Sequence, residues 1–310
     1  MDWKAFIDEQ IDSIRQAVGD GLAINALSGG VDSSVVTVLG HRALGDRLKT
    51  VFIDNALMRE GEPEFVVQTF AEMGIPVQRV NARQEFLGAL AGLTDPEEKR
   101  NAITATFYRQ VFGRLVRETG AKFLLHGTIL TDIEETVAGI KRQHNILAQI
   151  GIDPEQVYGY QVLEPLQTLR KDGVRQVAQF VGLPPSITQR IPFPGPALAA
   201  RIVGEVTPER LATVRAATAV VEQELADTNA FQYMAVLLQD KAPGIRDGRR
   251  EFGDILVVRC IDSVDAREAT VVELPWPKLH RICQRVTSLP GVNRCLYDLT
   301  PKPPATVEYV

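Results

Sequence analysis

The sequence predicts an α/β protein with a doubly wound parallel sheet, followed by a second, smaller α+β domain. Short apolar segments alternate with segments of helical periodicity from about residue 22 to residue 126, which is the pattern of strands joined by crossover helices. Two proline-rich segments, Pro184-Pro185 and Ile191 to Pro196, interrupt the chain after that and suit neither a helix nor an inner strand. We therefore place the domain boundary there, with a first domain over residues 1–190 and a second over residues 191–310.

The first domain begins with an amphipathic segment whose apolar residues recur at helical spacing up to Val18. The elements expected after it are a strand over 22–27, a helix that includes 35–39, a strand over 48–53, a further helix, a strand over 75–80, a helical segment within 95–119 and a strand over 122–126. Ligands of such sheets bind beyond the carboxyl ends of the strands. We therefore expect the site among the loops 28–34, 54–59 and 127–132.

Residues 137–160 follow neither periodicity and are rich in polar residues and glycine, which indicates a lid over a ligand. The second domain is expected to contain a capped helix over 207–226, strands over 233–239 and 255–260, a helix over 277–286 and a strand over 292–299. Long helices beside a few strands favour an α+β arrangement.

The most informative motif lies between the first strand and the helix after it, and consists of Ser28, Gly29, Gly30, Val31, Asp32, Ser33 and Ser34. Adjacent glycines let consecutive N–H groups converge on an anion, and the helix directs its positive end to the same place. The hydroxyls can donate to phosphate oxygens, whereas the Asp32 carboxylate would repel phosphate unless a divalent cation lies between them. The motif therefore predicts a nucleotide together with magnesium. The plainer alternative is a Gly-Gly turn with a helix cap, which any α/β protein could contain.

No lysine follows these glycines, in contrast to the GxxxxGK[ST] phosphate loop. The missing lysine argues against transfer of the terminal phosphoryl group. The loop suits cleavage of a nucleotide between its α and β phosphates, with release of pyrophosphate.

Composition restricts the remaining classes of function. The chain of 310 residues has 34 Lys and Arg against 39 Asp and Glu, a formal charge of −5, so we expect no general attraction to nucleic acid. No apolar run approaches the ~18 residues of a membrane span, and Met1 to Lys4 does not resemble a signal peptide, so we expect a cytoplasmic protein. The three cysteines are expected to be packing residues, and no histidine has a His or Cys at zinc-ligand spacing.

The SGGxDS pattern of the loop is that of the N-type ATP pyrophosphatases, and nearly the whole chain resembles the synthetase portion of the GMP synthetase family. The motifs that carry this resemblance are Phe52 to Arg59, Asp95 to Arg100, Gly127-Thr128-Ile129, Glu164-Pro165-Leu166, Lys171 to Arg175, Pro192 to Pro196, Pro290 to Arg294, Tyr297 to Thr300 and Pro301 to Glu308. The resemblance implies a sheet of the adenine nucleotide α-hydrolase type. It also implies ATP-dependent amination of XMP to GMP through an adenylyl-XMP intermediate.

Within the first domain we expect Ile53 and Gly127 to join the loop in binding ATP, and Asp32 and Asp132 to hold Mg²⁺. Asp32 is then also a catalytic residue. Two residues of the lid, Lys141 and His144, are expected to organise the phosphates and exclude water; a solvated loop without a catalytic role is the alternative for both.

By position, four residues match those that hold XMP in the family: Arg100, Gln232, Lys302 and Glu308. The residue types suit such a ligand, because Arg100 and Lys302 supply fixed cations for a phosphate, and Gln232 and Glu308 supply hydrogen-bonding groups for a purine edge. The resemblance further implies a homodimer formed through the second domain. No cysteine stands on a glycine-rich strand-to-helix turn, so ammonia is expected from a separate glutaminase subunit.

Three other functions stay open at the level of sequence. Departures from the family pattern at Arg267, at Val310 and in the lid at Gln143 leave room for a paralogue that amidates another purine or an acid. A sulfur-inserting tRNA enzyme would share the adenylation step, but the acidic net charge and the absence of a cysteine before Cys260 argue against it. A nucleotide-sensing subunit without catalysis is the third.

Overall fold

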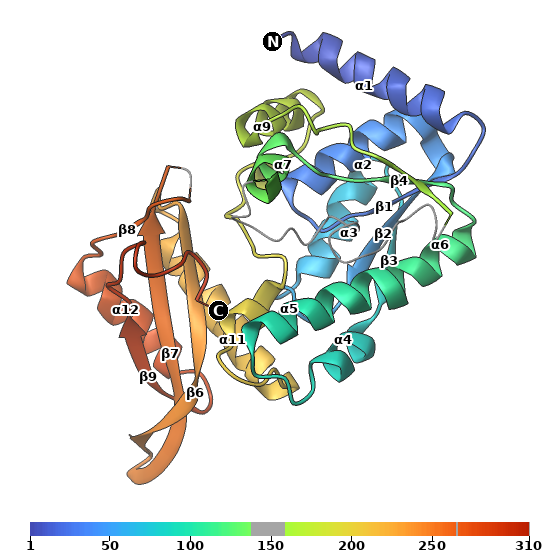
Figure 1. Cartoon of the computed structure of the whole chain (residues 1–310). Helices are drawn as coiled ribbons and strands as arrows, with labels where there is room; N and C mark the ends of the chain where they lie inside the picture. Colours follow the sequence, from blue (N-terminus) through green and yellow to red (C-terminus); the bar gives the residue numbers. More distant parts are fainter. Residues whose placement is uncertain (138–158, 265, 310) are drawn as a thin grey trace. The chain divides into compact units, whose positions relative to one another are not determined.

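The computed structural model describes residues 1–137, 159–264 and 266–309 (Figure 1). These residues form two compact units, the first comprising residues 1–54, 62–82 and 104–190 and the second residues 55–61, 83–103 and 191–310. One junction between the units lies at residues 190 and 191, where the sequence analysis set the boundary, whereas segments 55–61 and 83–103 belong to the second unit. The division into two functional domains stays a prediction.

A five-stranded parallel sheet forms the centre of the first unit, in the order β3-β2-β1-β4-β5. Its strands are β1 (Ala23–Ala26), β2 (Leu48–Asp54), β3 (Val77–Asn81), β4 (Phe123–Leu125) and β5 (Gln161–Leu163). The strand order reverses between β1 and β4, which is where doubly wound sheets bind their ligands. The predicted doubly wound parallel sheet is confirmed, and β5 is an additional strand that the sequence analysis did not identify.

The helical segments of this unit are α1 (Trp3–Val18), α2 (Val31–Leu44), η1 (Gly45–Arg47), α3 (Glu62–Glu72), η2 (Thr106–Phe112), α6 (Gly113–Thr119), α7 (Leu130–Val137), α9 (Lys171–Phe180) and α10 (Pro185–Thr188). Helices α1 and α9 both pack against α2, and α2 is buried along most of its length. The predicted end of the first helix is correct, since the N–H of Gly19 donates to the carbonyl of Arg15 (3.0 Å). Helix α2 is thus held firmly behind the loop that precedes it.

The second unit contains an antiparallel sheet of β6 (Gln232–Arg246), β7 (Arg249–Asp262) and β8 (Thr270–Val271), with β9 (Val292–Tyr297) parallel to β7. Its helical segments are α4 (Arg83–Leu90), α5 (Pro96–Ala105, whose last two residues count with the first unit), η4 (Ala197–Arg201), α11 (Pro208–Leu225) and α12 (Trp276–Thr287). Helix α11 packs against β6, and α12 packs against α11 and β9. The predicted α+β character of this part is confirmed.

The first two strands of this sheet form a hairpin that is much longer than the sequence analysis predicted (Figure 1). Asp247 (φ 51°) and Gly248 (φ 74°) make the two-residue turn between them. An Asp-Gly pair is a strong signal for such a turn. The strands were predicted too short because the polar residues near the turn weaken the apolar pattern.

Cys260, on β7, is fully buried, and burial raises the pKa of its thiol to about 11, as expected of a packing residue. Among the described helices, none is both long enough and apolar enough to cross a bilayer.

Candidate active site

The loop between β1 and α2 has the conformation of an anion-binding turn. Gly29 has a φ of 81°, and a Cβ at this position would lie 2.8 Å from Cγ2 of Val66, so both the backbone and the space require glycine. Gly30 is the N-cap residue of α2, and no side chain of the described residues caps this terminus. The first N–H groups of the helix therefore remain available to an anion at the positive end of the helix dipole.

Two serines fix the shape of this loop. The hydroxyl oxygens of Ser28 and Ser33 lie 2.8 Å apart, and Ser33 Oγ accepts from the N–H of Ser28 (3.1 Å) and donates to the carbonyl of Gly30 (3.1 Å). Ser34 differs from them because it is fully buried, and its hydroxyl has no hydrogen-bond partner in the described part of the chain. Ser28 and Ser33 are thus oriented by the loop itself, while Ser34 lies in the interior of the unit.

Asp32, in the first turn of α2, forms an ion pair with Lys171, the first residue of α9. Nζ of Lys171 lies 2.9 Å from Oδ1 and 2.7 Å from Oδ2 of Asp32. Both side chains are partly exposed, so the pair lies at the solvent edge of the loop. The sequence analysis found Lys171 only as part of a motif and gave it no role; local sequence could not place a residue 139 positions away beside Asp32.

The loop after β4 packs closely against the phosphate-binding loop. A Cβ at Gly127 would lie 3.2 Å from the nitrogen of Ser33 and 3.3 Å from the carbonyl carbon of Asp32, so this approach favours glycine. The neighbouring strand β2 contributes Ile53, which is buried near its carboxyl end. The expected convergence of strand ends on the loop is therefore present for Gly127, while nucleotide contacts of Gly127 and Ile53 stay predictions.

Asp132, the second proposed metal ligand, lies in the first turn of α7, where its Oδ2 accepts from the N–H of Ile129 (3.2 Å). The described residues contain no group of three or more side chains arranged to hold a metal. Magnesium that is carried by a nucleotide needs only one or two carboxylates, because phosphate oxygens and water complete its shell. The donor set of Asp32 and Asp132 fits that chemistry, and the metal site itself stays a prediction.

A partly buried hydrogen-bonded network connects two of the motifs near this loop. Nδ1 of His126 lies 2.8 Å from Oγ1 of Thr128, which donates to Glu164 Oε1 (2.5 Å). Burial lowers the pKa of His126, although the charge of Glu164 acts in the opposite direction, so the imidazole is neutral at pH 7. The network fixes the Gly127-Thr128-Ile129 turn against the segment that follows β5.

A second cluster of charged side chains lies in the second unit, around the start of β6. The carboxylate of Glu308 accepts from Nε2 of Gln232 and from Arg201, whose Nε and Nη2 each lie 3.4 Å from a carboxylate oxygen. Arg201 is 0% exposed, and its Nη1 has no hydrogen-bond partner among the described residues. An unpaired N–H on a buried guanidinium costs free energy, so this atom indicates a place for a further acceptor such as a phosphate oxygen.

The ring of Phe193 holds Arg201 from one side. The guanidinium carbon of Arg201 lies 4.7 Å from the ring centroid, and that of Arg59 lies 4.0 Å from the same centroid. Arg59 is itself paired with Glu222 (2.6 Å). Arg201 was not among the predicted site residues, because a lone arginine after an alanine-rich turn carries no local signal of its burial.

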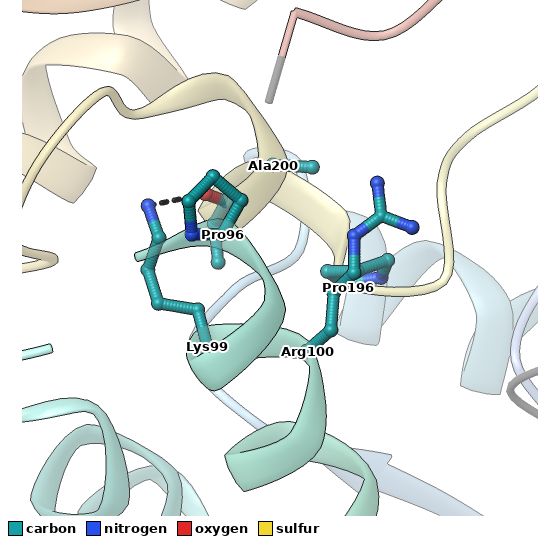
Figure 2. A pocket seen from close by; sticks show the side chains of 6 residues that line it. Pro96, Lys99, Arg100, Pro196 and Ala200 are labelled. Atoms are coloured by element: carbon teal, nitrogen blue, oxygen red, sulfur yellow. Dashed lines mark hydrogen bonds between the residues drawn. The ribbon is translucent and has the colours of Figure 1, made fainter. Parts of the chain in front are cut away.

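Arg100 lines a small pocket at the start of α5 (Figure 2). The other lining residues are Pro96, Lys99, Pro196, Ala199 and Ala200. Nε of Arg100 lies 3.8 Å from Glu97 Oε1, an exposed pair of the kind that contributes little to stability. Prolines and small residues form much of the pocket wall, so the surroundings of the Arg100 side chain have little conformational freedom.

Lys99, next to Arg100, is buried and donates from Nζ to the carbonyls of Ala199 (3.5 Å), Ile202 (2.7 Å) and Gly204 (3.0 Å); Figure 2 shows the first of these bonds. Burial and, to a smaller extent, the charge of Arg210 lower the pKa of Lys99 to about 8, against the opposing charge of Asp95. The ammonium group thus holds the segment that carries Arg201.

Lys302 lies on the C-terminal tail, residues 298–309, six residues before Glu308. Its Nζ donates to the carbonyl of Ala266 (2.7 Å), and its backbone pairs with Ala269 in an isolated antiparallel bridge. Of the four residues expected to bind XMP, the structure brings Gln232 and Glu308 into contact and places Lys302 on the same tail as Glu308, while Arg100 lies on α5. Lys141 and His144 lie outside the described residues.

Comparison with known proteins decides the family. A model of the GMP synthase C terminal domain matches residues 219–309. Over 310 residues the chain is 49% identical to a subunit of the glutamine-hydrolysing GMP synthase of Archaeoglobus fulgidus, and over 313 residues it is 47% identical to the corresponding protein of Pyrococcus horikoshii, with 100% of both chains covered in each case. The chain belongs to the family of these GMP synthase subunits.

Membership in this GMP synthase family confirms the predicted resemblance and the predicted class of enzyme, an ATP-dependent ligase. It does not favour a paralogue with another acceptor or a sulfur-inserting tRNA enzyme. Among solved structures, the NMN synthetase of Francisella tularensis is 14% identical with a TM-score of 0.50, over 64% of this chain and 78% of that chain. A likeness at this identity shows the fold alone, and it agrees with the predicted nucleotide-binding sheet.

Proposed function

We propose that this chain is the synthetase subunit of a GMP synthase and catalyses the ATP-dependent amination of XMP. In the first step the C2 oxygen of XMP bonds to the α-phosphorus of ATP while the bond to pyrophosphate breaks. In the second, ammonia attacks C2 of adenylyl-XMP, AMP leaves, and a proton is released. The products are GMP, AMP and pyrophosphate.

The observation that carries this proposal is the anion-binding turn of Ser28 to Ser34 in a chain of this family. The uncapped N-terminus of α2 and the positive φ of Gly29 suit the pyrophosphate portion of ATP. Lys171 adds a positive charge at the same place. We propose that Gly127 and Ile53 complete the nucleotide site, and that Lys141 and His144 organise the phosphates and exclude water.

Asp32 and Asp132 are the proposed ligands of Mg²⁺. When bound, the ion would neutralise charge on the departing pyrophosphate. The chain's own contribution is to hold Asp32 at the helix N-terminus, where Lys171 limits the carboxylate to one orientation.

In the second unit we propose that XMP binds to Arg201 and Lys302 through its phosphate and to Gln232 and Glu308 through polar groups of the nucleoside. Support comes from Nη1 of Arg201, which is buried and has no partner within the described residues, and from the contact of Gln232 with Glu308. Arg100 is proposed as a further XMP ligand. A dianionic phosphate requires such fixed cations, because water must be displaced from it on binding.

The names of the relatives make each of them one subunit of a glutamine-hydrolysing enzyme. We propose accordingly that a separate glutaminase subunit supplies ammonia to this chain, that the chain forms a homodimer, and that the enzyme is cytoplasmic. Glutamine alone should then support no synthesis, whereas ammonium should.

The test is to incubate the purified chain with Mg-ATP, XMP and ammonium and to quantify nucleotides and pyrophosphate by chromatography and coupled assay. We expect GMP, AMP and pyrophosphate in equal amounts. ADP and orthophosphate as products would contradict the proposed cleavage, and cleavage of ATP without GMP would contradict XMP as the acceptor.

A further inference from the structure

The tail that carries Lys302 and Glu308 has little regular structure of its own. Its backbone forms one isolated bridge within the described residues, between Lys302 and Ala269. Such a segment loses conformational entropy when it is ordered, so other groups must fix the positions of its side chains.

One buried arginine contacts the tail at both ends. Arg259, on β7, is 1% exposed and donates from Nη1 to the carbonyl of Thr300 (2.7 Å) and from Nη2 to the carbonyl of Thr306 (2.9 Å). Lys302 lies between these two residues. The hydroxyl of Thr306 in turn donates to the backbone carbonyl of Glu308.

The guanidinium is also paired with the first residue of the tail, Asp298, whose backbone is bonded to the sheet. Nη1 of Arg259 lies 2.7 Å from Oδ2 of Asp298, and the N–H of Asp298 donates to the carbonyl of Val258 (3.0 Å) on the same strand as Arg259. Burial raises the pKa of Asp298, but hydrogen bonds from Thr300 and the charge of Arg259 outweigh it, so this pKa lies below its ordinary value and the carboxylate stays ionised at neutral pH.

The Nε of Arg259 is buried and has no hydrogen-bond partner in the part of the chain that the structure describes, an arrangement that stability alone does not favour. The planar guanidinium places Nη1 and Nη2 at a fixed separation. Each nitrogen therefore reaches one of two carbonyls that are six residues apart in sequence. A lysine at this position has one terminal nitrogen, which cannot occupy the positions of both Nη1 and Nη2 at once.

We propose that Arg259 is a positioning residue for XMP, which acts by fixing the tail so that Lys302 and Glu308 face the substrate together. This inference rests on the proposed function of the tail residues. Arg259 does not itself touch the substrate.

The test compares Arg259→Lys with the wild-type enzyme by hydrogen exchange of residues 300–309 and by steady-state kinetics with ammonium. We expect faster exchange of the tail and a KM for XMP raised about tenfold, the size of effect given by a lost charged hydrogen bond. The KM for ATP should stay within about twofold.

Arg246→Lys is the matched control, because Arg246 also donates to backbone carbonyls of the same unit, those of Thr287, Leu289 and Val292, which lie outside the tail. It should change neither readout. Should Arg259→Lys fail to fold, Asp298→Asn, which leaves the arginine in place and removes its anionic partner, should change both readouts in the same direction by a smaller factor.

Unchanged tail exchange in the folded variant would overturn the positioning role while leaving the proposed function intact. Faster exchange with an unchanged KM for XMP would overturn the substrate role of Lys302 and Glu308, and the positioning role with it. A wild-type enzyme that makes no GMP would overturn the proposed function and with it the role of Arg259 toward XMP. Tail exchange is measured without substrate, so it would still show whether Arg259 fixes the tail.

Discussion

Asp32 is the residue on which the chemistry of the first unit depends most directly. Its carboxylate stands beside an uncapped helix N-terminus that attracts anions, so a second carboxylate or phosphate nearby needs a cation between them. Replacing it by asparagine removes the charge and keeps the shape. We expect Asp32→Asn to lower the turnover of ATP at least about 100-fold, measured as pyrophosphate release.

The stability of the Asp32→Asn enzyme should change by less than about 1 kcal/mol, because the pair with Lys171 is partly exposed. The control is Asp12→Asn, which breaks a similarly close pair with Arg15 (2.6 Å) on α1. That variant should retain full activity. If Asp32→Asn turned over at the wild-type rate, Asp32 would have no role with the metal.

The two glycines of the loop differ in backbone conformation, so the same substitution to alanine should affect stability differently at the two positions. In Gly29→Ala the residue keeps an unfavourable positive φ and its Cβ meets Val66 at 2.8 Å, whereas in Gly30→Ala φ is −77° and the nearest atom, Ser28 Oγ, is 3.4 Å away. Urea unfolding should show a loss of about 1–3 kcal/mol for Gly29→Ala and less than about 0.5 kcal/mol for Gly30→Ala. Equal losses would contradict the described loop conformation.

The residues of the candidate site could be predicted where a local sequence pattern marks them. They could not be predicted where their role depends on contacts with distant segments of the chain. Two glycines between an apolar segment and a helical one predict the phosphate-binding loop, so its position could be found from the sequence. Lys171 and Arg201 reach their partners from distant parts of the sequence, and no local pattern marks them. The missing lysine after Gly30 was therefore a correct observation about the loop but an incomplete one about the site, since Lys171 brings an ammonium group to it.

At the scale of elements, a buried lysine and a half-buried arginine hold the segment after η4. Lys99 binds the carbonyls of Ala199, Ile202 and Gly204, and Arg210 on α11 binds those of Val203 and Glu205. Backbone carbonyls of an irregular segment need such donors when they are buried. The arrangement fixes the position of Arg201 without a regular strand or helix after it.

The charge of Lys99 should make stability depend on pH in a defined window. Its pKa is about 8 in the folded protein and near 10.5 when the chain is unfolded, so between these values the unfolded chain binds more protons. The free energy of unfolding therefore gains a contribution that rises with pH from 8 to 10.5, by up to about 3 kcal/mol. Urea unfolding of the wild type and of Lys99→Met at pH 7.5, 8.5 and 9.5 measures it as the difference between the two proteins.

Lys99→Met is the appropriate reference, because tyrosines, cysteines and other lysines that titrate in this range contribute to both proteins. The wild type should gain stability relative to the variant as the pH rises. A difference that is constant over the three pH values would show that the folded-state pKa of Lys99 is not lowered.

Where periodicity identified an element it predicted the type but not the length, and helices α4, α7 and α9 were not predicted. The helix predicted within 95–119 is present as α5, η2 and α6, in which a turn of π-helix replaces regular α-helix; hydrogen-bond shifts of this kind leave no trace in an apolar pattern. Strand β5 was not predicted, because a strand of three residues is too short to show an alternating apolar pattern. The β6–β7 hairpin was underestimated because most residues of its outer part are exposed or only partly buried, so the apolar pattern is weak there, although Asp247-Gly248 marks the turn.

At the scale of the whole molecule, the residues proposed to bind the two substrates are divided between the two compact units. The residues proposed for pyrophosphate and magnesium belong to the first unit, and those proposed for XMP, including Arg100 on α5, belong to the second. The sequence placed the junction at residues 190 and 191 through its prolines, yet segment 83–103 joins the second unit although it lies between two strands of the first. Chain order alone does not reveal such an exchange, because it depends on tertiary packing.

This division predicts that each substrate protects its own set of amides from hydrogen exchange. Mg-ATP alone should slow exchange in residues 28–34 and 127–132, and XMP alone should slow it in residues 200–204 and 300–308, because each ligand supplies acceptors to groups that the described residues leave open, as at Nη1 of Arg201. Xanthosine, which lacks the phosphate, is the control and should give far weaker protection at the same concentration, since the fixed cations then have no anion to bind. Protection of residues 28–34 by XMP alone, or equal protection of the tail by xanthosine, would contradict the assignment of the phosphate to Arg201 and Lys302.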